Sequence, residues 1–291
     1  MNIERIKSAL ATGGEHLGDL LWWHLGDARI DRGQLESIWM KTGLDAALLP
    51  DAPTAEKALK LAAREAQVGQ RERLIRLGKE DEHELVFAIV HEQRHDDGNL
   101  SFRQEARVVL ERACEKLSSD VSTHDVVESI KTKFDVLRTT HTPDDVRRAI
   151  VKALRSWASV TLRDHGGVYW SPPTVAQKVR RLQGAIEQIG SSLFSVLPVH
   201  RSVEAERTLG GIARASVEED LAALQAEIAT FVQAPPERAS TLARRLEMFD
   251  ELRARARVYR DVLHVQVQDL DQHLDRLAAS VGQLLDQKSA A

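Results

Sequence analysis

The string HEQRH at His91–His95 is the pattern whose residue types and spacing most directly suggest chemistry. In zinc peptidases, two histidines four residues apart share one face of a helix and bind the metal, while the glutamate between them polarises a bound water. Here a β-branched, apolar run precedes the string, and Asp-Asp-Gly at 96–98 would end any helix at once. On a strand the two histidines would lie about 13 Å apart, too far for one zinc ion. We therefore predict a solvated strand end and no metal site.

Other patterns that carry catalytic chemistry are missing from the sequence. It contains no phosphate-binding glycine loop of the P-loop or dinucleotide type, no G-x-S-x-G nucleophile turn and no paired C-x-x-C. The single cysteine, Cys114, excludes an intramolecular disulfide and a cysteine-based zinc site. We predict that the protein is not an enzyme and needs no cofactor.

Residues 121–190 carry the more credible functional pattern. Apolar stripes predict one helix over 126–137 and a second over 143–157, and two short strands around Gly166-Gly167 follow. Thr142 as N-cap, Pro143 in the first turn and two acidic residues after it give the second helix a strong start signal. Two helices followed by a hairpin is the order of a winged helix, which places its second helix in the DNA major groove.

The charges of this region favour a polyanionic partner. Residues 121–190 contain eleven Lys and Arg against seven Asp and Glu, a net charge of +4, whereas the whole chain carries −4. Cationic residues gather on the second helix, opposite its apolar stripe, and on the expected wing. The predicted nucleic-acid-binding residues are Arg147, Arg148, Lys152, Arg155, Arg163 and His165. The alternative is a helical domain whose exposed face happens to be basic.

The elements around this region complete the expected architecture. We predict an N-terminal helical region over 1–70, where Leu17, Leu20, Leu21 and Leu25 recur at helical spacing. A small antiparallel sheet plus helix is expected over 71–120, and within it residues 107–117 could be either strand or helix. A winged-helix-like basic domain over 121–200 and a long helical hairpin over 201–291 follow. The fold class is thus mainly α with a small antiparallel β element (α+β).

The C-terminal hairpin is expected to pack against a second copy or a partner helix. Prolines 235 and 236 separate two apolar stripes, and the second continues with alternating spacings of four and three, as in a coiled coil. A single helix over 237–287 would span about 75 Å, far more than the first helix can cover. The expected contacts to a second copy or partner helix are Leu263, Val267, Leu270, Leu274, Leu277, Val281 and Leu284. Packing back onto the same chain is the alternative.

The string Gly166-Gly167-Val168-Tyr169-Trp170-Ser171-Pro172, with the helix and helical hairpin after it, resembles an uncharacterised protein family of bacteria, archaea and their viruses or plasmids. The similarity covers about residue 142 to the C-terminus. It implies a role associated with a mobile element, phage or defence system, and it implies no catalytic residues.

Composition sets the remaining expectations. The amino terminus has no apolar run of signal-peptide length, and no segment approaches the ~20 apolar residues that span a bilayer, so we expect a cytoplasmic protein without a membrane partner. The leading hypothesis is a non-enzymatic protein that binds DNA or RNA and assembles through its C-terminal hairpin. The alternative is a protein-interaction scaffold that oligomerises without nucleic acid.

Overall fold

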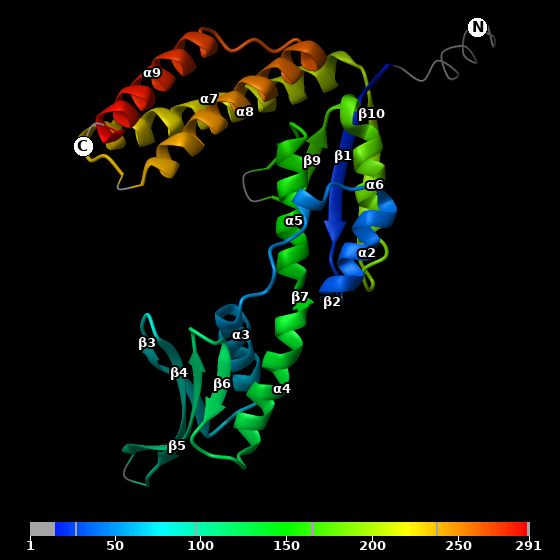
Figure 1. Ribbon diagram of the computed structural model, residues 1–291. Coiled ribbons are helices and arrows are strands. Elements are labelled where there is room, and N and C mark those ends of the chain that lie inside the picture. Colours follow the sequence, from blue (N-terminus) through cyan, green and yellow to red (C-terminus); the bar gives the residue numbers. More distant parts are fainter. Residues whose placement is uncertain (1–14, 27, 97, 164–165, 237, 290–291) are drawn as a thin grey trace, which may run out of the picture. The chain divides into compact units, whose positions relative to one another are not determined.

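Helices and antiparallel strands are interspersed along the described part of the chain (Figure 1). The computed structural model describes residues 15–26, 28–96, 98–163, 166–236 and 238–289. These residues form eight α-helices and three antiparallel sheets, and 54% of them are helical and 23% are in strands. The prediction of a mainly α chain with a small β element is therefore wrong, because the strands form three sheets, one of which includes a strand near the N-terminus where a helix was expected.

The described residues divide into two compact units, each discontinuous in sequence. Unit 1 comprises Met1–Gly26, Thr42–Leu48 and Arg148–Ala291, and unit 2 comprises Asp27–Lys41 and Leu49–Arg147.

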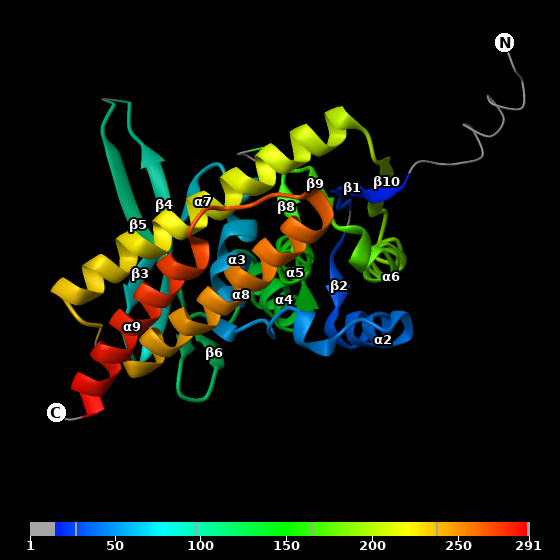
Figure 2. The same cartoon turned by 90° about the horizontal axis from the view of Figure 1, so that it is seen from above.

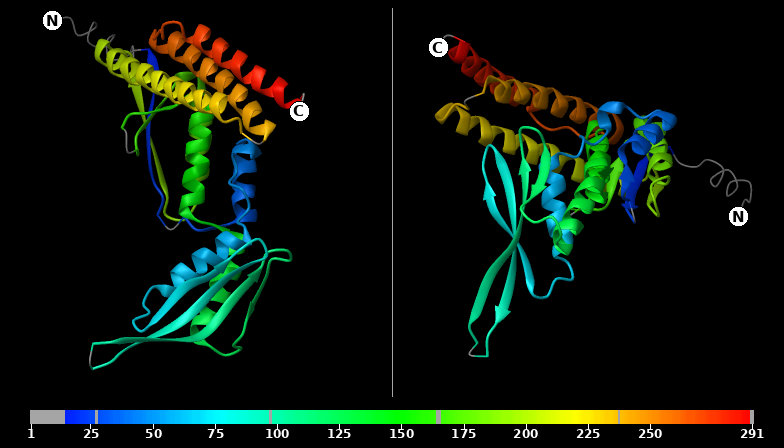
Figure 3. Two further views of the ribbon diagram at one scale, coloured as in Figure 1. Left: turned by 90° about the vertical axis from the view of Figure 1, so that its left-hand side faces the viewer. Right: turned by 60° about the horizontal axis from the view of Figure 1, so that its bottom comes forward.

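Unit 2 contains a four-stranded antiparallel sheet with consecutive strands as neighbours. The strands are β3 (Arg73–Glu80), β4 (Glu84–Arg94), β5 (Leu100–Glu111) and β6 (Lys116–Ser119). The predicted antiparallel sheet is confirmed here, and the open stretch 107–117 belongs to β5 and β6 and not to a helix. β4 and β5 extend beyond β3 as a long hairpin (Figure 3).

Two helices pack on one face of this sheet, α3 (Ala55–Gln67) and α4 (Asp125–Thr139) (Figure 1). Thr54 caps α3 by accepting a hydrogen bond from the Lys57 amide. The buried face of α3 is rich in alanine, whose small side chain lets α4 approach closely, and Ile130 and Phe134 of α4 complete the core against β4 and β5. Unit 2 also contains most of α2 (Arg32–Thr42) and a small sheet formed by β2 (Ile30–Asp31) and β7 (Thr140–His141).

Unit 1 is built on a second four-stranded sheet, of order β10-β1-β9-β8. Its strands are β1 (His16–His24), β8 (Val160–Thr161), β9 (Tyr169–Ser171) and β10 (Leu193–His200). The helix predicted around Leu17–Leu25 is wrong, because this segment is the central strand β1. Leu17 is buried in the core around Trp170, and Leu20 packs against the same core. Leu21, the next residue along the strand, lies on the opposite face and is also buried. Because side chains on both faces of β1 are apolar, its sequence does not show the alternation of apolar and polar residues that marks a strand.

The helix α5 carries four of the six predicted nucleic-acid-binding residues. α5 (Pro143–Ser156) joins β7 to β8 along the chain, and its residues from Arg148 onward belong to unit 1. The short turns η1 (Ala46–Leu48) and η2 (Pro173–Val175) and the helix α6 (Ala176–Ile186) also belong to unit 1. α6 packs against β10.

Three helices, not two, form the C-terminal part: α7 (Val203–Gln233), α8 (Ala239–Leu263) and α9 (Leu270–Ser289). They lie side by side in two views (Figures 1 and 2). The predicted two-helix hairpin is therefore wrong. The break before the prolines is as predicted, but the second apolar stripe is divided between α8 and α9 by the irregular segment 264–269, where His264 adopts a left-handed conformation.

The break between α8 and α9 explains how the long apolar stripe is covered. A single helix would leave its apolar side chains beyond the reach of α7, whereas folding α9 back lets α7 and α8 cover them. The resulting core continues to the sheet, where Trp170 packs against Tyr259 with ring centroids 6.2 Å apart.

Candidate nucleic-acid interface

α5 begins where the sequence predicts, with a reciprocal cap. The Thr142 hydroxyl accepts a hydrogen bond from the Asp145 amide (3.3 Å), and the Asp145 carboxylate accepts one from the Thr142 amide (2.9 Å). Lys57 also donates to this carboxylate. The buried face of the helix comprises Val146, Ala149, Ile150, Ala153 and Leu154.

The opposite face of α5 exposes Arg148, Lys152 and Arg155. Lys152 donates a hydrogen bond of 2.6 Å to the Ala47 carbonyl, and Arg148 takes part in an interaction within the chain. The Arg155 side chain has no hydrogen bond or ion pair with any described residue. The face is therefore exposed, and at its C-terminal end it offers a cation with no internal partner.

The other predicted contact residues lie in different settings. Arg147 belongs to unit 2 and forms an exposed ion pair of 2.8 Å with Asp144. Arg163 follows β8 and is exposed, and its side chain makes no ion pair or hydrogen bond within the described part of the chain. His165 lies outside the described residues.

The predicted hairpin after α5 is present, since Val160 of β8 pairs with Trp170 of β9. It is part of a larger sheet, however, because β9 also pairs with β1. In addition, α4 belongs to unit 2 and the cationic part of α5 to unit 1. This differs from the winged-helix order, in which both helices and the hairpin form one unit.

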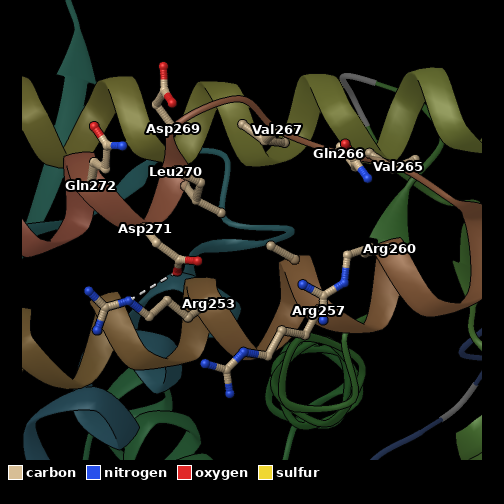
Figure 4. A pocket seen from close by; sticks show the side chains of 11 residues that line it. Arg253, Arg257, Arg260, Val265, Gln266, Val267, Asp269, Leu270, Asp271 and Gln272 are labelled. Atoms are coloured by element: carbon tan, nitrogen blue, oxygen red, sulfur yellow. Dashed lines mark ion pairs between the residues drawn. The ribbon is translucent and has the colours of Figure 1, made fainter.

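Two further cationic features were not among the predicted contacts. On α6, Lys178 is exposed and has no partner among the described residues, whereas Arg181 donates to the Gly43 carbonyl and Arg180 lies 3.7 Å from the buried Asp19 carboxylate. On α8, Arg253, Arg257 and Arg260 line a pocket with residues 265–272 (Figure 4). Spacings of four and three residues place the three arginines on one side of α8, and this could be predicted from the sequence. The pocket itself forms only because the helix ends at Leu263 and the segment after it folds back.

The residues predicted to join two copies lie in the core of unit 1. Leu263, Leu270, Leu274, Val281 and Leu284 are buried, with Leu274 and Val281 fully so. Val267 and Leu277 are partly buried against the same cluster. The uncovered stripe that motivated the oligomerisation prediction is thus covered by α7 and α8 of the same chain.

The HEQRH string lies at the end of β4, as expected from its sequence context. His91 points its Nδ1 at Glu105 (3.4 Å), whereas the His95 ring contacts the Ser101 hydroxyl (2.8 Å), so the two histidines have different partners. In the part of the chain that the structure describes, no three His, Cys, Asp or Glu side chains are placed to hold a metal ion.

Comparison with known proteins gives one match. The profile of a family described as a family of unknown function, DUF6744, matches residues 16–290. No curated protein and no solved structure matches the chain. Across the described ranges, no helix is both long and apolar enough to cross a membrane.

Proposed function

This chain belongs to the family of unknown function DUF6744, and because that membership brings no activity with it, we propose from its own geometry that it binds nucleic acid. The proposed contact is made by the C-terminal end of α5 and the turn after β8. The part of the nucleic acid that is contacted is the phosphodiester backbone, which DNA and RNA share.

One observation carries the proposal: Arg155, five residues before β8, and Arg163, two residues after it, are both exposed, and neither side chain has an acidic partner among the described residues. A phosphate that meets such a cation releases counterions, and no internal ion pair has to break first. The pair of Arg147 with Asp144 is different, since a phosphate there would compete with a carboxylate.

The surrounding charges support the same contact. Residues 148–190 contain seven Lys and Arg against two acidic residues. Lys152 donates to a carbonyl, which satisfies one of its hydrogens but leaves its positive charge without a counter-charge at that atom. Since the expected contacts are to phosphate, we propose binding with weak sequence preference and a strong dependence on salt.

The test is a variant that replaces Arg155 and Arg163 by glutamine. Its affinity for a fluorescent oligonucleotide, measured by anisotropy over a salt series, should fall, and the slope of log K against log salt should decrease by roughly 0.7–0.9 per arginine. The matched control is Arg76→Gln with Arg94→Gln, two exposed arginines of unit 2 that have no partner among the described residues.

The proposal fails if the wild-type chain has no affinity at low salt. It also fails if the Arg155 and Arg163 double variant binds as the wild type does, or if the control pair loses as much affinity.

A second candidate, a protein-interaction scaffold, is favoured by exposed apolar side chains on the sheet of unit 1. Trp22 is 42% exposed, Leu197 51% and Leu193 61%. Trp22 and Leu20 pair with Ser195 and Leu197 across β1 and β10, so alternation places these side chains on one face. A folded protein without any nucleic-acid affinity in the titration above would leave this candidate in place.

A further inference from the structure

The pocket beside α8 has the size of a small-ligand site. It encloses about 360 Å³ between the last turns of α8 and the segment 265–272 (Figure 4), which lies within the range of ligand pockets. Its walls come from parts of the chain held together by the shared core of α7, α8 and α9. The pocket is therefore formed before any ligand enters.

The three arginines of the pocket differ in what already neutralises them. Arg253 is held by the carboxylates of Asp271 and Asp275, so it frames the pocket without offering a free charge. Arg260 contacts Asp261 through Nε at 3.3 Å, and no described residue accepts from its terminal amino groups. Arg257 is exposed and has no hydrogen bond or ion pair with the described residues. The whole guanidinium group of Arg257 and the terminal amino groups of Arg260 thus remain to donate hydrogen bonds to an anion.

The rest of the lining is mixed. Ala256, Val265, Val267 and Leu270 contribute aliphatic surface. Of the two acidic residues in the lining, Asp271 is paired with Arg253, and Asp269 directs its carboxylate away from the arginines in Figure 4. An aliphatic wall beside two guanidinium groups fits a ligand with one strongly anionic end and a less polar body.

We propose that this pocket binds a phosphate monoester of nucleotide size, with the phosphate on Arg257 and Arg260 and the body against Val265 and Val267. A monoester carries about −1.5 to −2 charges at pH 7 and three strong acceptor oxygens, and a planar guanidinium group donates two parallel hydrogen bonds to phosphate oxygens. A phosphodiester has only two unesterified oxygens, so it offers the two arginines fewer strong acceptors than a monoester does. The site is separate from Arg155 and Arg163, so it stands or falls independently of the proposed nucleic-acid contact.

Calorimetric titration with adenosine 5′-monophosphate tests the site, with adenosine as the ligand that lacks the phosphate. The wild type should bind the monophosphate at least about tenfold more tightly than adenosine, and Arg257→Gln with Arg260→Gln should remove most of that difference. The control is Arg244→Gln with Arg276→Gln, which removes the same charge from exposed positions of α8 and α9 outside the pocket. Circular dichroism confirms that each variant is folded.

Competition identifies the source of the monoester. If a 5′-phosphorylated oligonucleotide displaces the monophosphate and its 5′-hydroxyl counterpart does not, the ligand is the phosphorylated end of a strand. If neither oligonucleotide displaces it, the ligand is a free nucleotide. The inference is overturned if both oligonucleotides displace equally, if adenosine binds as tightly as its monophosphate, if neither binds at about 1 mM, or if the control pair weakens binding as much.

Discussion

At the scale of single residues, the decisive property of a cation is whether the chain already neutralises it. Arg155, Arg163 and Arg257 have no partner among the described residues. Helical spacing predicted that Lys152 and Arg155 share an exposed face, but it did not predict that Lys152 reaches a carbonyl 105 residues away in sequence. Faces follow from local periodicity, whereas partners depend on the tertiary fold, and this is why the candidate site was only partly predictable.

Glu105 shows the opposite case, a carboxylate with several cationic partners. Arg73 donates to it at 2.9 Å and His124 contacts it at 3.2 Å. Burial raises the pKa of Glu105, but the hydrogen bond from His124 and the charges of Arg73 and His91 together lower it below the ordinary value of 4.5. Because its pKa is lower in the folded state, ionised Glu105 stabilises the fold above pH 4.5, and this contribution is lost as pH falls through the folded pKa.

We therefore expect Glu105→Gln to lower the free energy of unfolding by about 1–3 kcal/mol at pH 7, and by less below the folded pKa of Glu105. Urea denaturation at neutral and acidic pH measures both values. Glu82→Gln, at an exposed position between β3 and β4, is the control and should change neither. A loss that is equal at both pH values would contradict this account.

At the scale of elements, the sequence predicted best where the signals are local. The cap of α5, the helix α4 and the hairpin of β8 with β9 all form near their predicted positions. β1 was missed because its partners, β9 and β10, lie about 150 to 180 residues further along the chain and cover it on both edges. The spacing of the leucines in this segment fits a helix. The segment forms a strand because β9 and β10 pair with it, and these partners cannot be recognised from the local sequence.

A single glycine lets β1 fit between these neighbours. Gly18 has a φ of +140°, and a β-carbon at this position would overlap the Ser171 carbonyl oxygen and the Trp170 indole nitrogen. Gly18→Ala should therefore lower the free energy of unfolding by about 1–3 kcal/mol. Gly211→Ala in α7, where a β-carbon meets nothing within 4 Å, should instead raise it by about 0.5–1 kcal/mol.

Chemical denaturation of both glycine variants measures these changes. A Gly18 variant as stable as the wild type would show that β1 can move away from β9 at little cost.

At the scale of the whole molecule, the position of α9 decides whether the C-terminal helices need a second copy. Leu274 is fully buried in the cluster that α7, α8 and α9 share within one chain. The heptad-like spacing of the sequence is compatible with both an interchain coiled coil and this fold-back. The spacing sets which face is apolar, but the break at His264 decides what covers it.

Leu274→Ala should lower the free energy of unfolding by about 2–5 kcal/mol, as expected for a buried leucine. Because the contacts lie within one chain, the loss should be the same at every protein concentration, whereas an interchain contact would make it depend on concentration. Thermal unfolding at two concentrations a hundredfold apart measures this. A midpoint that rises with concentration for the wild type would contradict the fold-back.

The interleaving of the two units has a consequence for how the protein is made. β1 leaves the ribosome early, but its partner β10 begins at Leu193, so at synthesis rates of about 5–20 residues per second the strand waits roughly 10–35 s for its second neighbour. During that interval the segment carrying Trp22 and Trp23 has no sheet to join. Unit 2, whose last residue is Arg147, is completed first. Nascent-chain chaperones are thus expected to engage β1 until its partner strands emerge.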